Sequence, residues 1–281
     1  MNSTLAQWQR GERGQVLWID CERYAWRVFA GATAEWYQDP VRFAGTIGQA
    51  LRVVRSDVVA IDVLAPFIAA WRAEAAHEQV PVSVCALTDF LSQQPACLSF
   101  ISEVADALQH AVGDRADLAL KLFSPRDLLL AVGADEALAS DFSALDDLGA
   151  ALVELLRNLS SKAFACLQLH TLAPAGLSAD EQDAYAPILR TAEYYGWITC
   201  LSFGGVHADT LPDCEAAIAL YPEVAAEDLV DTAERRCGGG LTSRFWLGPD
   251  PLAGELGLLH GTIPADAYPG AVAEKIRSLG R

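Results

Sequence analysis

The sequence predicts an α/β fold of the (β/α)8 TIM-type barrel class, in a single domain of 281 residues. Three observations favour this class. Eight short runs rich in Val, Ile and Leu alternate with longer segments of helical periodicity, as in repeated βα units. The runs are continuously apolar, which is typical of parallel strands covered on both faces. No G-x-G-x-x-G follows the first run, so the main signal for an open dinucleotide-binding sheet is absent.

The first 56 residues are expected to form an N-terminal helical extension that contains a short apolar run at 15–19. The barrel is expected to occupy residues 57–281. A glycine triplet at 238–240 is interpreted as a local loop. The expected strands are 57–63, 81–87, 117–123, 164–171, 197–203, 215–221, 243–248 and 256–260.

Helical periodicity fills the segments between these runs. The segment 178–195 begins with a capping box, in which Ser178 is the N-cap and Glu181 stands three residues later. The segment 223–236 carries acidic residues early and arginines late, in line with the helix dipole. The expected helices are 39–55, 135–158, 178–195, 223–236 and 271–279.

The composition limits the class of partner. The chain is 52% hydrophobic and has a formal net charge of -17. A surface of this charge repels nucleic acid and anionic lipid, so the expected partner is a small-molecule substrate. An anionic substrate would need a locally basic pocket within this acidic protein.

Seven cysteines are scattered along the chain without a C-x-x-C pair, which is typical of buried, reduced thiols. The first residues are polar and contain no apolar signal-peptide core. No run approaches the roughly 20 apolar residues that span a bilayer. We therefore expect a cytoplasmic protein that does not enter a membrane.

Five short motifs occur in a fixed order. They are WIDCERY at 18–24, VVAIDVLAP at 58–66, QLHTLAPAGLS at 168–178, LGPDP at 247–251 and HGTIP at 260–264. In this order and spacing the chain resembles the uroporphyrinogen decarboxylase family. The resemblance covers most of the chain and implies a TIM barrel, in agreement with the strand count.

The resemblance implies a lyase of porphyrin biosynthesis, which decarboxylates a carboxylated, tetrapyrrole-like substrate without a cofactor. It places Asp62 on the family aspartate that stabilises developing charge and Arg23 on an arginine that holds a carboxylate. His260 would orient the substrate or transfer a proton. Family members often pair through the barrel mouth, which makes a homodimer the expected assembly.

The family pattern breaks at several pocket positions. Asp20 or Cys21 stands near the family's first arginine, Leu172 replaces a serine, and Ala131 lies near a tyrosine position. We therefore expect a rebuilt pocket of diverged specificity. The residues that could contribute new substrate contacts are Arg27, Lys121, Arg126, His170 and Thr171.

Two alternatives stay open. The same superfamily contains zinc-dependent corrinoid and thiol methyltransferases, and His207, Asp209 and Cys214 could form an altered zinc site here. His260 stands where those enzymes carry a cysteine, which argues against zinc, so the leading interpretation includes no metal. The second alternative is a family member that binds a ligand without catalysis.

Overall fold

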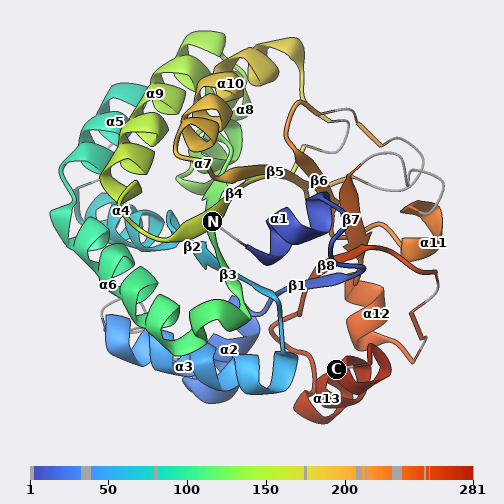
Figure 1. Cartoon of the computed structure of the whole chain (residues 1–281). Coiled ribbons are helices and arrows are strands. Elements are labelled where there is room, and N and C mark those ends of the chain that lie inside the picture. Colours follow the sequence, from blue (N-terminus) through green and yellow to red (C-terminus); the bar gives the residue numbers. More distant parts are fainter. Residues whose placement is uncertain are drawn as a thin grey trace.

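The computed structural model describes residues 3–32, 39–78, 82–173, 176–206, 211–212, 214–229, 236–249, 251–252 and 254–280. Eight parallel strands close into a barrel in chain order, as Figure 1 shows. The predicted fold class is confirmed. The strands are β1 (Val16–Asp20), β2 (Val58–Asp62), β3 (Asp117–Phe123), β4 (Phe164–Thr171), β5 (Ile198–Phe203), β6 (Ile218–Tyr221), β7 (Cys237–Gly240) and β8 (Leu258–Thr262).

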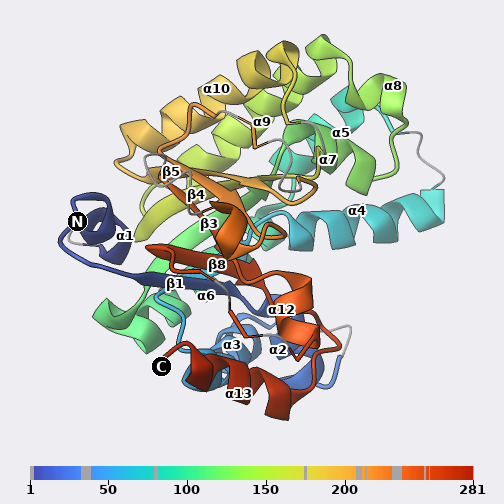
Figure 2. The same ribbon diagram turned by 90° about the vertical axis from the view of Figure 1, so that its right-hand side faces the viewer.

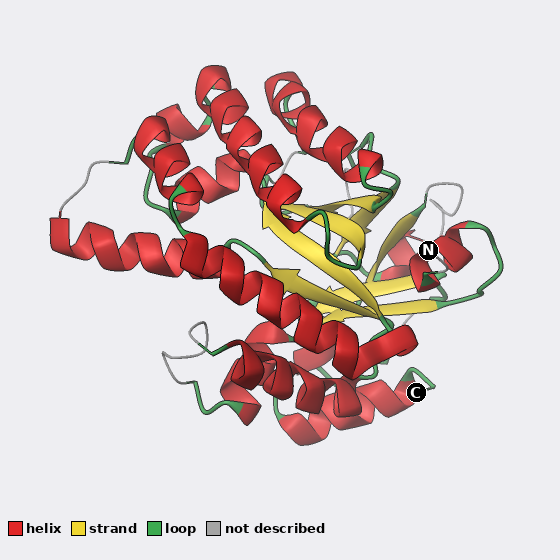
Figure 3. Cartoon of the chain, turned by 60° about the vertical axis from the view of Figure 1, so that its left-hand side comes forward, coloured by secondary structure: helices red, strands yellow, loops and turns green. Residues whose placement is uncertain are grey.

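Helices surround the barrel, and Figure 3 shows the strands enclosed by them. None of the described helices is both long and apolar enough to cross a membrane. The helices are α1 (Thr4–Gln9), α2 (Glu22–Phe29), α3 (Pro40–Val54), α4 (Ala65–Glu78), α5 (Val84–Ser92), α6 (Pro95–Val112), α7 (Pro125–Ala131), α8 (Glu136–Ala139), α9 (Phe142–Leu159), α10 (Ala179–Tyr194), α11 (Ala226–Leu229), α12 (Ser243–Leu247) and α13 (Pro269–Ser278).

Two predicted strands are helices. The run at 243–248 forms α12, whose N-cap Thr242 accepts a hydrogen bond from the Phe245 amide at 3.1 Å. The run at 81–87 mostly belongs to α5, which Ser83 caps in the same way, while residue 81 lies outside the described residues. The periodicity of a short apolar run does not show whether it forms a strand or a helix. A Ser or Thr directly before the run, which can act as an N-cap, favours the helix.

Two strands were missed, which is why the predicted number of eight still holds. The run at 15–19 belongs to β1, which pairs with both β2 and β8. The barrel therefore begins at residue 16, and the predicted boundary at 57 is wrong. The glycine triplet forms most of β7. A Cβ on Gly239 would lie 2.5 Å from the Tyr221 carbonyl oxygen, so close packing explains a strand made of residues with low strand propensity.

Most predicted helices are confirmed. The Ser178 capping box is present at α10, and α3 begins after its N-cap Asp39. The long helix predicted at 135–158 is divided into α8 and α9, because Asp141 caps a new helix by accepting from the Ala144 amide. The helix predicted at 223–236 is observed only as α11, and residues 230–235 lie outside the described part of the chain.

Side-chain alternation divides the barrel into two faces. Outward residues pack beneath the helices, and inward residues fill the lower barrel with a separate apolar cluster. Helix α1 closes that end, as Figures 1 and 2 show, and its Leu5 joins the cluster. The cluster consists of Leu5, Val16, Trp18, Val58, Ala119, Cys166, Cys200, Ile218, Leu220 and Leu258.

Gly261, beside His260, is fixed by a close approach of two backbones. A Cβ at this position would lie 2.0 Å from the Leu241 carbonyl oxygen. A Cβ on Gly48 of α3 would meet no atom within 4 Å. The HG pair of the sequence motif is therefore explained by packing at its glycine.

We predict opposite effects for two Gly→Ala substitutions. Gly261→Ala should lower the free energy of unfolding by at least about 2 kcal/mol, because backbone must move to relieve the clash. Gly48→Ala should raise it by about 0.5–1 kcal/mol through helix propensity. Urea unfolding measures both. Equal effects of the two substitutions would contradict the β7–β8 packing described above.

Candidate functional site

Polar side chains gather at the C-terminal ends of the strands, directly above the apolar cluster. They lie on the inward face because each is an even number of residues from a member of that cluster. This end of a TIM barrel carries the chemistry in enzymes of the fold. The residues are Asp20 on β1, Asp62 on β2, Lys121 on β3, Gln168 and His170 on β4, Ser202 on β5 and His260 on β8.

A charged pair links two of these strands. Lys121 Nζ lies 2.6 Å from Asp20 Oδ2, and both side chains are largely buried. Burial alone would raise the pKa of Asp20, but Lys121 holds it below its ordinary value. Burial would lower the pKa of Lys121, but Asp20 and Asp62 raise it. Both groups therefore stay charged near neutral pH.

Asp62 caps a helix with one carboxylate oxygen, and its other oxygen accepts no hydrogen bond from a described residue. Its Oδ1 accepts from the amides of Leu64 at 3.1 Å and Ala65 at 3.0 Å, which caps the start of α4. Its Oδ2 has no hydrogen bond to any described residue, and the side chain is partly exposed at the mouth. Burial raises the pKa of Asp62 despite the nearby Lys121, so this carboxylate is suited to take up a proton.

His260 is a buried, neutral imidazole. Its Nδ1 lies 3.1 Å from the Trp18 carbonyl oxygen. A carbonyl can only accept, so Nδ1 carries the hydrogen and Nε2 keeps its lone pair. Burial lowers the pKa of His260 to about 4. The ring is therefore a fixed acceptor near neutral pH.

His170 lies on the inward face of β4. Its Nδ1 lies 3.2 Å from Ser202 Oγ, and its ring packs edge-to-face on Phe123. Gly204 allows this position, because a Cβ there would lie 2.7 Å from the ring carbon Cε1. Burial lowers the pKa of His170 to about 3. This ring is also neutral.

Gln168 leaves a buried acceptor unsatisfied. The residue is 2% exposed, and Oε1 has no hydrogen-bond partner among the described residues. In register, Gln168 neighbours Lys121 on one side and Cys200 on the other. Neither Gln168 nor Asp20 was among the residues predicted for the site, and Asp20 was considered only as a position near the family's first arginine. Asp20 follows Trp18 by two residues and Gln168 follows Cys166 by two residues, so each shares the inward face of its strand with a residue of the apolar cluster.

The structure brings Asp62, Lys121, His170 and His260 together but leaves other predicted residues outside this group. Arg23 and Arg27 are exposed on α2 and make no hydrogen bond or ion pair with a described residue. Thr171 lies on the outward face, where its hydroxyl accepts from the Ala173 amide. Arg126 pairs with Glu136 at 2.8 Å.

The candidate zinc residues are only partly described. His207 and Asp209 lie outside the described residues, and Cys214 is half-buried near the Ala216 carbonyl. Within the described part of the chain, no three His, Cys, Asp or Glu residues are grouped so that they could hold a metal. The described donors therefore do not fit a zinc centre. No disulfide joins any of the seven cysteines, all of which lie in the described part of the chain.

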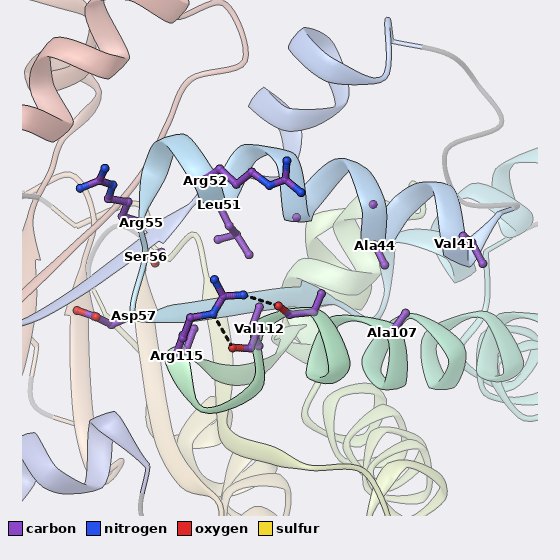
Figure 4. Close-up of a pocket in the computed structure, with 14 residues that line it drawn as sticks. Val41, Ala44, Leu51, Arg52, Arg55, Ser56, Asp57, Ala107, Val112 and Arg115 are labelled. Atoms are coloured by element: carbon purple, nitrogen blue, oxygen red, sulfur yellow. Dashed lines mark hydrogen bonds between the residues drawn. The ribbon is translucent and has the colours of Figure 1, made fainter.

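A cavity of about 600 Å³ lies between α3 and α6, away from this mouth. Figure 4 shows Arg115 between the two helices, where it donates to the carbonyls of Ala111 and Val112. Asp57, which directly precedes β2 at the N-terminal end of the barrel, also lines the cavity. Residues at the N-terminal end of a TIM barrel usually contribute to stability, whereas the active site lies at the C-terminal end.

The fold is similar to that of a methyltransferase. A methyltransferase from Methanosarcina mazei superimposes with a TM-score of 0.66 at 14% identity, over 98% of this chain and 96% of that chain. The homocysteine methyltransferase MmuM from Escherichia coli gives a TM-score of 0.34 at 10% identity, over 96% of this chain and 97% of that chain. No protein-family model and no curated protein sequence matches.

We predict that removing only one partner of the Asp20–Lys121 pair strongly lowers the free energy of unfolding. Lys121→Met should lower the free energy of unfolding by about 3–5 kcal/mol, because it leaves a buried carboxylate unpaired. Adding Asp20→Asn should recover most of the loss. Lys162→Met, which removes a pair with the exposed Asp106, should cost less than about 1 kcal/mol. Urea unfolding of the wild type, the two single variants and the double variant measures these changes in the free energy of unfolding. A double variant no more stable than Lys121→Met would contradict a buried charged pair.

We predict an acid-dependent loss of stability from the two histidines. Their pKa values lie below the ordinary 6.5, so the unfolded chain binds more protons below that pH. The free energy of unfolding is unaffected by these two groups above pH 6.5. It falls as the pH is lowered from 6.5 toward 4, and the part due to His260 is on the order of 3 kcal/mol.

The measurement is urea unfolding at several pH values between 7.5 and 4. His260→Gln should make the loss between pH 6.5 and 4 shallower, whereas His110→Gln, on the exposed side of α6, should not change it. An unchanged slope in His260→Gln would show that His260 is not buried as a neutral ring.

Proposed function

We propose that this chain is a methyltransferase that transfers a methyl group from a small donor to a thiol at the barrel mouth. The observation that carries the proposal is Asp62, a carboxylate with a raised pKa and an uncommitted Oδ2 at that mouth. The similarity of the whole fold to a methyltransferase structure supports it as an analogy of fold.

The charge of the mouth supports methyl transfer over decarboxylation of a polycarboxylate. Several carboxylates need several cations, usually arginines that bind them bidentately. Lys121 is the cation of the described mouth, and Asp20 already neutralises it. Arg23 and Arg27 lie exposed on α2, outside this group. The decarboxylase interpretation of the sequence therefore has less support than the methyltransferase alternative.

The proposed step needs one proton acceptor. The thiol gives its proton to Asp62, and the resulting thiolate attacks the methyl carbon. A carbon–sulfur bond forms as the bond between that carbon and the donor atom breaks, and the donor atom keeps the electron pair. The Asp20–Lys121 pair and His260 hold the surrounding charges and hydrogen bonds fixed, which lowers the cost of reorganisation in the transition state.

We predict that Asp62→Asn slows methyl transfer at least about 100-fold, because the thiol loses its proton acceptor. The assay incubates the protein with 13C-methyl-labelled ammonium, sulfonium and thioether donors and a small thiol, and it follows the S-methyl product by NMR. Asp146→Asn, on the exposed face of α9, is the matched control and should keep the full rate. Release of CO2 from a porphyrinogen, without any S-methyl product, would contradict the proposal.

A further inference from the structure

We infer that the cavity between α3 and α6 binds a small amphipathic anion. The oxyanion is held by Arg52, Arg55 and Arg115, and the apolar part lies on the alanine and glycine residues of the two helices. The cavity is separate from the barrel mouth, so the inference does not depend on the proposed methyl transfer. It concerns a binding site without chemistry, because the active site of a TIM barrel lies at the opposite end.

The cavity has the size and the lining of a small-molecule site. Its volume is about 600 Å³. Pockets for small molecules typically measure about 300–1,000 Å³ and combine an apolar surface with a few polar groups. Figure 4 shows Val41, Ala44 and Ala107 toward one end of the cavity and Arg115 toward the other. An occupant therefore contacts an apolar surface at one end and a cationic side chain at the other.

The charge of the lining favours an anion. The segment 40–56 carries three arginines and no acidic residue, although the whole chain contains 37 acidic and 20 basic residues. Asp57 is the carboxylate among the described residues of the lining. It is already paired with Arg13 at 2.8 Å and accepts from the Leu17 amide at 2.9 Å. The uncompensated charge of the lining is therefore positive and attracts an anion.

The three arginines of the lining keep donors for an oxyanion. Arg115 is fixed at the end of α6, because Nε donates to the Val112 carbonyl at 3.2 Å and Nη2 to the Ala111 carbonyl at 2.6 Å, which leaves Nη1. Arg52 and Arg55 make no hydrogen bond or ion pair with a described residue. Their exposed side chains extend in opposite directions along α3 (Figure 4), and rotation about side-chain bonds can bring each over the cavity. Guanidinium groups bind carboxylate or phosphate through paired hydrogen bonds.

Arg55 occupies a backbone conformation that favours glycine. It is the C-cap of α3 and has a φ of 53°, in the left-handed region. Glycine is the usual residue in this conformation at the end of a helix. The side chain of Arg55, rather than its backbone, therefore explains why an arginine stands here. Contact of its guanidinium with a bound anion gives that side chain a role.

Glycine is unexpected at two positions of α3 that line the cavity. Gly45 and Gly48 lie in the interior of the helix, where glycine is unfavourable. A Cβ on either residue would meet no atom within 4 Å, so packing inside the protein does not require glycine there. Glycine does allow a ligand to approach the backbone closely. The two glycines therefore keep the surface of α3 free for the apolar part of the bound molecule.

Isothermal titration calorimetry with three eight-carbon probes tests the inference. The probes are sodium octanoate, octyl phosphate and octylammonium chloride, each used below the concentration at which it forms micelles. They share one chain and differ in the charged group. We expect at least one of the two anions to bind and octylammonium not to bind. Which of the anions binds identifies the charged group as a carboxylate, a phosphate or either.

Two variants locate the binding while the fold is kept. Gly48→Leu fills the cavity with a residue of high helix propensity and should weaken anion binding at least 10-fold. Arg55→Gly combined with Arg52→Gln removes two cations and relieves the left-handed backbone, and it should also weaken binding at least 10-fold. The matched controls are Gln49→Leu, exposed on α3 outside the lining, and Arg190→Gln, exposed on α10. Both should bind like the wild type, and urea unfolding checks that every variant is folded.

The inference is overturned if neither anion binds or if octylammonium binds as tightly as the anions. It is also overturned if either Gly48→Leu or the arginine variant keeps the affinity of the wild type. The assay for the S-methyl product is a separate measurement at the barrel mouth. A negative result in one of the two experiments therefore leaves the other proposal in place.

Discussion

The ion pair between Asp20 and Lys121 sets the charge of the barrel mouth. It joins the ends of β1 and β3 across the inner wall at 2.6 Å, and without it each partner would be a buried, uncompensated charge. Because the lysine is neutralised, it cannot serve as a free cation for a carboxylate. Because Asp20 is neutralised as well, Asp62 becomes the carboxylate with an open oxygen. The neutral states of His170 and His260 follow from the same burial.

The barrel could be predicted from the sequence in part because β3 and β4 are long strands rich in apolar residues, and their predicted bounds match the structure. The prediction failed at β7, whose glycines have low strand propensity and are required by packing against Tyr221 and Leu229. It also predicted strands where α5 and α12 lie, because these short helices contain apolar residues in runs that resemble strands. Tertiary contacts determine the secondary structure of such short segments, and these contacts cannot be derived from a single sequence.

The candidate site was predicted in part. Asp62, Lys121, His170 and His260 were singled out because they end apolar runs or match family motifs, and the structure brings them together. Arg23 and Arg27 were chosen by motif alone and lie on the outside of α2. Alternation along β4 could have placed Gln168 on the inward face, but the unsatisfied state of its oxygen is visible only in the three-dimensional structure. The sequence therefore indicated residues at the ends of the strands, while the charges and hydrogen-bond partners around them had to come from the three-dimensional arrangement.

The most direct test of this account is a 13C NMR titration of the carboxyl carbons of Asp20 and Asp62. The account predicts that Asp20 titrates below the ordinary range of an aspartate, because Lys121 stabilises its charge. It predicts that Asp62 titrates above that range, because burial disfavours its charge. The reverse order, with Asp20 protonated at a pH where Asp62 is still ionised, would contradict the charge arrangement on which the proposed site depends.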